Sequence, residues 1–279
     1  MEKFVNWLTN WLFKQLGIGR QFEFTKRHKF ILAATIATIF LALTQVVPLN
    51  LRYWTVALLA ILTAGLTLAT LWEEFAGVKY AILLILPVYF VTGVALFYFL
   101  LPVRWLTRLP VLAIFGISMY LLFLTQNIYN IAAIRTIQLL RAAHAVGFLF
   151  TIVSAFLIYN VIFALHLPFY WIFVAIFVIT LPLLISAIWA FELEEHLSVR
   201  VLVYSFVISL AVAQIALALS FWPILPIIGA LATVSALYVS LGVTQFHFAD
   251  RLTRRTVLEY SSVAAVVFIL MLITTHWSG

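Results

Sequence analysis

The chain contains no cysteine, and only 9% of its 279 residues are charged. The absence of cysteine excludes disulfides, thiolate nucleophiles and cysteine-ligated metals. A soluble domain usually carries about a quarter charged residues. A soluble fold of this length would therefore lack the polar side chains needed to cover its surface, and a membrane protein is expected instead.

Charge is also missing from the middle of every long apolar segment, where no Asp, Glu, Lys or Arg occurs. Charged side chains inside a bilayer are costly and typically mark proton relays, ion pathways or voltage sensors. Their absence argues against a proton- or sodium-coupled transporter. Metal-spacing motifs such as H-E-x-x-H are absent too, so we expect no metal and no cofactor.

What the chain does contain is long apolar runs, with 66% hydrophobic residues in all. Each run is close to the ~20 residues that a helix needs to cross ~30 Å of hydrocarbon. The sequence therefore predicts an all-α polytopic bundle of about nine spans, with eight as an alternative. The predicted spans are 30–49, 53–72, 79–101, 109–126, 143–165, 168–190, 201–221, 224–245 and 257–276.

Two parts of this layout leave alternatives open. Residues 127–142 fit either an interfacial helix or an extension of the fifth span, and the second and third spans fit partly re-entrant segments. Residues 1–19 place Trp7 and Trp11 on one helical face and Asn6 and Asn10 on another. They predict an interfacial amphipathic helix, or a helix packed under the bundle. Residues 20–279 then form a single transmembrane domain.

The basic residues predict the orientation. With the N-terminus in the cytoplasm, thirteen of the 16 fall on the cytoplasmic side, and the outer loops hold only Arg52, Arg104 and Arg108. Positive charge concentrates in cytoplasmic loops and beside anionic headgroups. The net charge of +7 therefore predicts contact with the cytoplasmic leaflet, not with nucleic acid. Nine spans place the C-terminus outside.

One candidate catalytic cluster lies where the sixth and eighth spans end. Its members are Glu192, Glu195, His196, His247 and Asp250. Carboxylates and imidazoles brought together there would suit a divalent metal or acid–base chemistry. The alternative is that charged residues simply collect where helices leave the membrane and form solvated ion pairs.

A candidate binding stripe follows the fourth span. Arg135, Gln138, Arg141 and His144 recur every three residues. Guanidinium groups at a membrane interface suit phosphate groups of lipids or substrates. The alternative is that these long side chains merely reach toward the headgroups.

The stretch from Asn127 to Phe156 reads NIYNIAAIRTIQLLRAAHAVGFLFTIVSAF. Together with the hydropathy layout, it resembles a family of uncharacterised bacterial multi-pass membrane proteins defined only as a domain of unknown function. The resemblance implies a bacterial inner membrane. It carries over no catalytic or binding residue.

Three functions remain open at this stage. A permease- or flippase-like component for a lipidic or small neutral substrate fits nine spans with prolines at positions 87 and 182. A structural subunit or scaffold with membrane-protein partners fits the absence of charge within the spans. An integral membrane enzyme would use the Glu/His cluster.

The orientation is directly testable because the chain has no native cysteine. We expect the single variants Lys26→Cys, Glu194→Cys and Arg254→Cys to react with a maleimide only from the cytoplasmic side. Arg104→Cys should react only from outside. An even number of membrane crossings separates Lys26, Glu194 and Arg254 from one another, whereas an odd number separates each of them from Arg104. Labelling of Arg254→Cys from outside would overturn the layout.

Overall fold

A computed structural model describes residues 26–44, 47–48, 51–71, 79–100, 105–133, 138–194 and 196–275. In these residues the chain forms nine α-helices, each long and apolar enough to cross a membrane, and no strand. The helices are α2 (Lys26–Thr44), α3 (Arg52–Leu71), α4 (Lys79–Leu100), α5 (Trp105–Ala132), α6 (Leu140–Ala164), α7 (Phe169–Glu192), α8 (Val199–Ser220), α9 (Pro226–Phe248) and α10 (Arg254–Thr274). The predicted all-α bundle with nine spans is confirmed for this part of the chain.

The boundary between α5 and α6 differs from both sequence-based alternatives. Residues Asn127 to Ala132 continue α5, and Leu140 begins α6. Residues 127–132 therefore extend the fourth span, and residues 140–142 begin the fifth. The second and third spans are continuous helices of 20 and 22 residues. Residues 1–19, the proposed amphipathic helix, lie outside the described residues.

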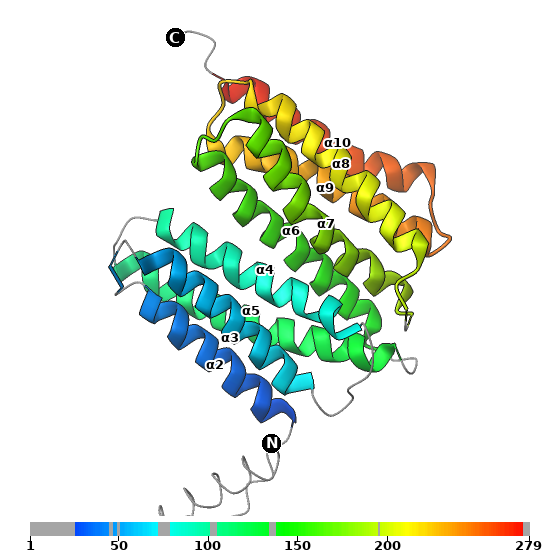
Figure 1. The fold of residues 1–279 in the computed structure, drawn as a ribbon. Helices are drawn as coiled ribbons and strands as arrows, with labels where there is room; N and C mark the ends of the chain where they lie inside the picture. Colours follow the sequence, from blue (N-terminus) through cyan, green and yellow to red (C-terminus); the bar gives the residue numbers. More distant parts are fainter. Residues whose placement is uncertain are drawn as a thin grey trace, which may run out of the picture.

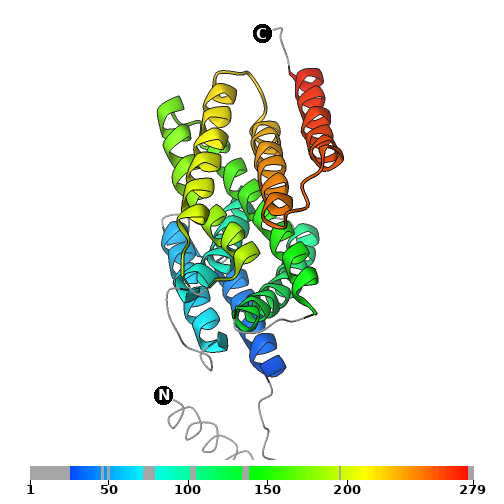
Figure 2. The same cartoon turned by 90° about the vertical axis from the view of Figure 1, so that its right-hand side faces the viewer.

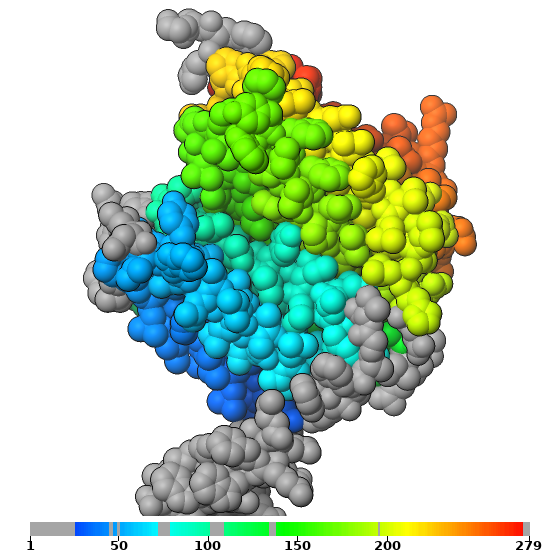
Figure 3. Space-filling view, in the orientation of Figure 1, coloured from blue at the N-terminus to red at the C-terminus, as the bar shows by residue number. Residues whose placement is uncertain are grey.

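Two helices occupy the centre of the bundle. α4 packs against α3, α5, α6 and α7, while α6 packs against α4, α5, α7 and α9. Figure 1 shows α2, α3 and α5 on one side of this pair and α7 to α10 on the other. In the space-filling view, α3, α4, α7 and α8 form much of the near surface of the molecule (Figure 3). Residues on α4 and α6 are consequently the best shielded from lipid.

Successive helices run in opposite directions, so α2, α4, α6, α8 and α10 all begin at one end of the bundle, at the lower right in Figure 1. We call this the basic end. It carries Lys26, Lys79, Arg141, Arg200 and Arg254. The clustering of helix-terminal charges follows from the cost of placing them in hydrocarbon.

Many hydroxyl groups inside the spans find partners on the protein, although the buried hydroxyls of Ser205 and Ser209 have none within the described residues. Thr63 donates to the carbonyl of Leu59, and Thr67 donates to that of Thr63, each over 2.8 Å. Between helices, the Tyr159 hydroxyl and the Thr180 hydroxyl lie 2.5 Å apart across α6 and α7. Such bonds are needed because hydrocarbon offers no water to a buried polar group.

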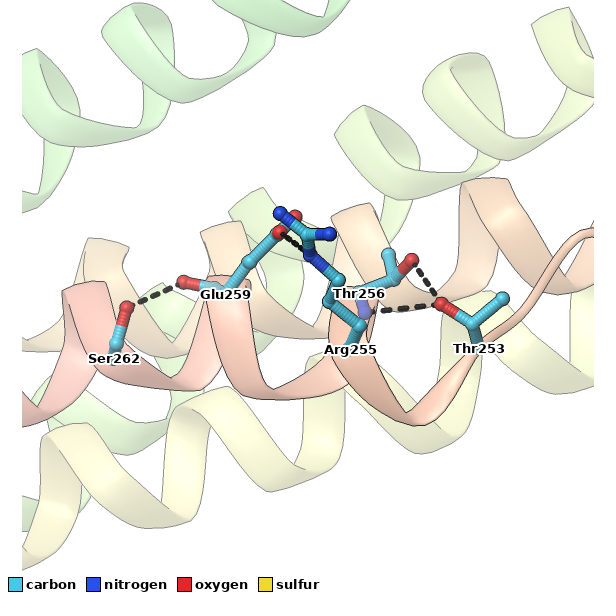
Figure 4. A network of polar contacts seen from close by, with 5 residues as sticks. All are labelled: Thr253, Arg255, Thr256, Glu259 and Ser262. Carbon is cyan, nitrogen blue, oxygen red and sulfur yellow. Dashed lines mark hydrogen bonds and ion pairs between the residues drawn. The ribbon is translucent and has the colours of Figure 1, made fainter.

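The last helix stands at the edge of the bundle. α10 packs chiefly against α9, and Met271 is its only buried residue within Arg254–Thr274 (Figure 2). Its start is defined locally, because the Thr253 hydroxyl accepts a hydrogen bond from the Thr256 amide at 3.2 Å (Figure 4). An N-cap of this kind satisfies one of the free amides at a helix start. Arg255 pairs with Glu259 at 2.9 Å one turn later.

The packing of α5 on α6 predicts a sharp effect at one glycine. A methyl group at Gly147 would overlap the Tyr129 hydroxyl, whereas at Gly65 it would meet nothing within 4 Å. We expect Gly147→Ala to lower the free energy of unfolding by about 1–3 kcal/mol, as overpacking does.

Chemical unfolding in detergent would measure this difference. Gly65→Ala is the control and should be neutral or stabilising by up to about 1 kcal/mol, because alanine favours the helix. Combining Gly147→Ala with Tyr129→Phe should remove most of the overlap. Equal stability of Gly147→Ala and the native chain would contradict this packing.

Candidate functional site

Polar contacts between helices concentrate at the basic end of α4 to α7. Tyr129 donates its hydroxyl hydrogen to the carbonyl of Ala143 at 2.8 Å, which joins α5 to α6. His144 Nε2 lies 2.8 Å from the carbonyl of Ala190, which joins α6 to α7. A carbonyl can only accept, so Nε2 carries the hydrogen. Ser186 joins α7 to α4 by donating to the carbonyl of Ile82 at 3.1 Å.

Aromatic rings surround the histidine. The ring centroids of Tyr129 and His144 are 5.8 Å apart, and the Phe191 ring meets His144 edge-on at 5.9 Å. A cavity beside these rings is lined by Gly147, Thr151 and Ser186 among others, and has a volume of about 10 Å³. That is space for at most about one water molecule.

The two prolines inside α4 and α7 lie at the same depth. α4 and α7 are antiparallel, and the Ser186–Ile82 bond places Pro87, five residues beyond Ile82, opposite Leu181 and Pro182. Both helices continue through their prolines. The small cavity borders this region, with Leu86 in its wall. It is too small for a permeating substrate.

The predicted binding stripe is only partly within reach of this site. Of its four members, His144 is half-buried in the contacts above, and Gln138 and Arg141 are exposed. Arg135 lies outside the described residues. Exposed Arg141 sits at the start of α6, where a guanidinium is free to contact a headgroup. Binding by these residues stays a prediction.

The predicted catalytic cluster forms separate local pairs among the described residues. Glu192 accepts a hydrogen bond from Ser198 at 2.6 Å, and His247 Nε2 lies 3.1 Å from the Tyr204 hydroxyl. His196 and Asp250 are exposed. Across the part of the chain that the structure describes, no three His, Asp or Glu residues are placed to hold a metal ion. Glu195 lies outside that part, and a catalytic role stays a prediction.

Sequence reasoning missed two buried polar side chains at the basic end. Lys79, the first residue of α4, is 5% exposed, and Gln126 in α5 is 1% exposed. The signal for Gln126 was present, because the polar run from Thr125 to Asn127 interrupts an apolar segment. Nothing in the pattern showed that it faced the protein rather than the membrane surface.

Two grooves open sideways from the bundle. One has a volume of about 450 Å³ and lies between α8, α9 and α10, toward the end opposite the basic end. Its lining is Ile215, Ala218, Leu219, Trp222, Ala232, Ser235, Ala236, Ala264, Phe268 and Met271. The other, of about 410 Å³, lies between α2 and α5 beside Thr38 and Gly116. Both are predominantly apolar.

The family "Protein of unknown function (DUF5656)" matches residues 76–274. The chain belongs to the DUF5656 family. The match contains α4 to α10, and with them the polar contacts at the basic end and the groove beside α10. It also contains the stretch 127–156 that carried the sequence resemblance, which is thereby confirmed. No curated protein and no solved structure matches the chain.

The contacts of His144 predict a measurable contribution to the stability of this DUF5656 protein. We expect His144→Phe to keep the ring packing but lose the bond to Ala190. The free energy of unfolding should fall by about 0.6–1.7 kcal/mol, the range of hydrogen bonds between transmembrane helices.

Unfolding in detergent would again supply the measurement. His166→Asn is a suitable control, because His166 is exposed, its ring bonds to the carbonyl of Ala164 at the end of α6, and its φ of 48° is one that Asn tolerates. Equal losses in both variants would show that the contact with Ala190 is not special.

Proposed function

We propose that this DUF5656 protein is a permease- or flippase-like component of the bacterial cytoplasmic membrane that acts on a lipidic substrate. The observation that carries the proposal is the 450 Å³ groove between α8, α9 and α10, whose mouth faces the bilayer. The basic end would face the cytoplasm, where positive charge is retained. The N-terminus would then be cytoplasmic and the C-terminus outside.

The occupant that suits this groove is one acyl chain. Its volume lies within the ~300–1,000 Å³ of ordinary ligand sites. Small side chains, such as Ala218, Ala232 and Ala264, leave the space, and Trp222 lies where an interfacial indole is favoured. Each buried methylene contributes about 0.8 kcal/mol when it leaves water, but much less when it leaves lipid, so shape rather than hydrophobicity would select the chain.

A lipidic substrate is better supported than a small neutral one. Transporters with interrupted helices bind polar solutes near the centre of the membrane. The cavity in that position here, near Pro87 and Pro182, has a volume of only about 10 Å³. A lipid needs no such central chamber, because it can enter from the side. The two lateral grooves supply that access.

A second candidate function is a subunit of a membrane complex, and one observation favours it. α10 has a single buried residue within the helix, and its exposed surface includes Ser261 and Ala265, four residues apart. Two small residues at this spacing allow close approach of another transmembrane helix. An enzyme remains the third possibility, but the separate partners of Glu192 and His247 lend it no support.

Adjacent alanines on α10 separate the first two functions. Ala264 lines the groove, and Ala265 is exposed outside it. We expect Ala264→Phe to fill the groove and reduce lipid retention at least about tenfold, which corresponds to about 1.4 kcal/mol of binding free energy. Native mass spectrometry from micelles containing phosphatidylglycerol would measure retention, and dithionite quenching of labelled lipid in proteoliposomes would measure movement between leaflets.

Ala265→Phe is the matched control and should leave both readouts unchanged. Loss of oligomers or partner subunits in Ala265→Phe, with normal lipid retention in Ala264→Phe, would instead favour the subunit role. Unchanged lipid retention and movement in Ala264→Phe would refute the groove as a lipid site.

A further inference from the structure

Two side chains that carry hydrogen-bond donors, Lys79 and Gln126, are buried at the basic end. Gln126 Nε2 is buried and has no hydrogen-bond partner in the described part of the chain. The Lys79 ammonium lies 5.8 Å from the centroid of the Tyr80 ring, and no carboxylate within the described residues pairs with it. Burying an unpaired donor costs about 1–3 kcal/mol, and more when the donor is charged. The unpaired amide of Gln126, together with a lysine that has no carboxylate partner among the described residues, indicates that a bound molecule supplies the acceptors.

The packing of α4 on α5 places these two donors at the same depth. The rings of Phe90 and Phe115 stack with their centroids 6.0 Å apart, which sets the register of the two antiparallel helices. Lys79 precedes Phe90 by eleven residues, and Gln126 follows Phe115 by eleven. Eleven residues span about 16 Å and about three turns of helix. Both donors are therefore near one level, and each is on the same face of its helix as the stacked ring.

α6 brings a third donor to this level. A methyl group at Gly93 of α4 would lie 3.2–3.4 Å from atoms of Ser154, Leu157 and Ile158, which sets the register of α4 against α6. Lys79 precedes Gly93 by fourteen residues on α4. On α6, which runs in the same direction, Ala142 precedes the middle of the contact, Phe156, by the same number. The exposed guanidinium of Arg141 is thus at the depth of Lys79.

The start of α4 adds to the positive potential. Lys79 is the first residue of this 22-residue helix, and no acidic residue occurs in its first turn. The free amides and the dipole at a helix start attract anions. Basic pockets between transmembrane helices on this side of a membrane are known sites for anionic headgroups.

We infer that Lys79 and Gln126 form the base of a phosphate-binding site between α4, α5 and α6, with Arg141 at its rim. The buried amide of Gln126 and the cationic ammonium of Lys79 are donors that match the oxygens of a phosphate ester. This inference rests on the proposed function and deepens it, since it names the headgroup chemistry that a transported lipid would present at the basic end, opposite the end toward which the groove lies. A lipid phosphate and a soluble phosphate ester share that chemistry, and the experiment separates them.

The test uses the full-length protein in micelles doped with either phosphatidylglycerol or diacylglycerol of the same chains. Native mass spectrometry counts the lipid retained. The native chain should prefer phosphatidylglycerol at least about tenfold, as expected for charge-assisted hydrogen bonds. Lys79→Met and Gln126→Leu should each remove most of that preference, whereas Lys79→Arg should keep it. Lys26→Met, which removes an exposed charge from the basic end, is the control and should behave like the native chain.

Two further arms identify the ligand. Gln126→Glu places a carboxylate against the phosphate and should weaken retention more than Gln126→Leu. Glycerol 3-phosphate at millimolar concentration should displace phosphatidylglycerol if the site takes soluble esters, and should fail to do so if it needs the lipid. Together with the headgroup preference of the native chain, this result says which source fills the phosphate site.

Native-like retention in both Lys79→Met and Gln126→Leu would overturn the site. Thermal unfolding of each variant separates loss of binding from loss of fold. The groove is tested independently: a lost headgroup preference with an intact effect of Ala264→Phe would refute the phosphate site alone. An intact headgroup preference with no effect of Ala264→Phe would refute the groove alone.

Discussion

Hydrocarbon accepts neither charge nor an unpaired backbone group, and every level of this structure follows from that constraint. Nine helices in the described residues satisfy their own backbone hydrogen bonds, as a membrane requires. Their hydroxyls bond to carbonyls one turn back, as Thr63 does with Leu59. The charged side chains are left to the helix ends, and most of them lie at one end of the bundle.

The constraint also explains where polar contacts between helices occur. Near the basic end, Tyr129, His144 and Ser186 connect α5 to α6, α6 to α7 and α7 to α4. Toward the opposite end, the space between α8, α9 and α10 is lined mainly by apolar side chains. The polar contacts and the apolar groove therefore lie at different levels and on different helices. The groove is the physical basis of the proposed function.

The centre of the bundle and its edge also differ in packing. α4 and α6 are enclosed by other helices, while α10 rests chiefly on α9. Contacts around Gly147 leave no room for a methyl group, yet the groove beside Ala264 is open. A closely packed centre resists change in shape, because its side chains interlock. Movement of a ligand would therefore involve the edge formed by α8, α9 and α10 more readily than the centre.

The sequence by itself determined the number of spans, their approximate limits and the confinement of charge to their ends, because a hydrocarbon layer selects apolar runs of a definite length. It predicted nine spans close to the observed helices, with limits that differ by several residues. It left residues 127–142 open between an interfacial helix and the fifth span, whereas residues 127–132 continue α5, because a polar residue such as Asn127 is permitted in a helix when other helices shield it.

Only the tertiary structure decided which polar residues meet. It paired Glu192 with Ser198 and His247 with Tyr204, and it buried Lys79 and Gln126 at one depth. Periodicity gives the face of a residue on its own helix, but the neighbour that this face meets depends on helix order and register. Those are set by side-chain packing between segments far apart in the chain, such as Phe90 on Phe115, and no local pattern records them.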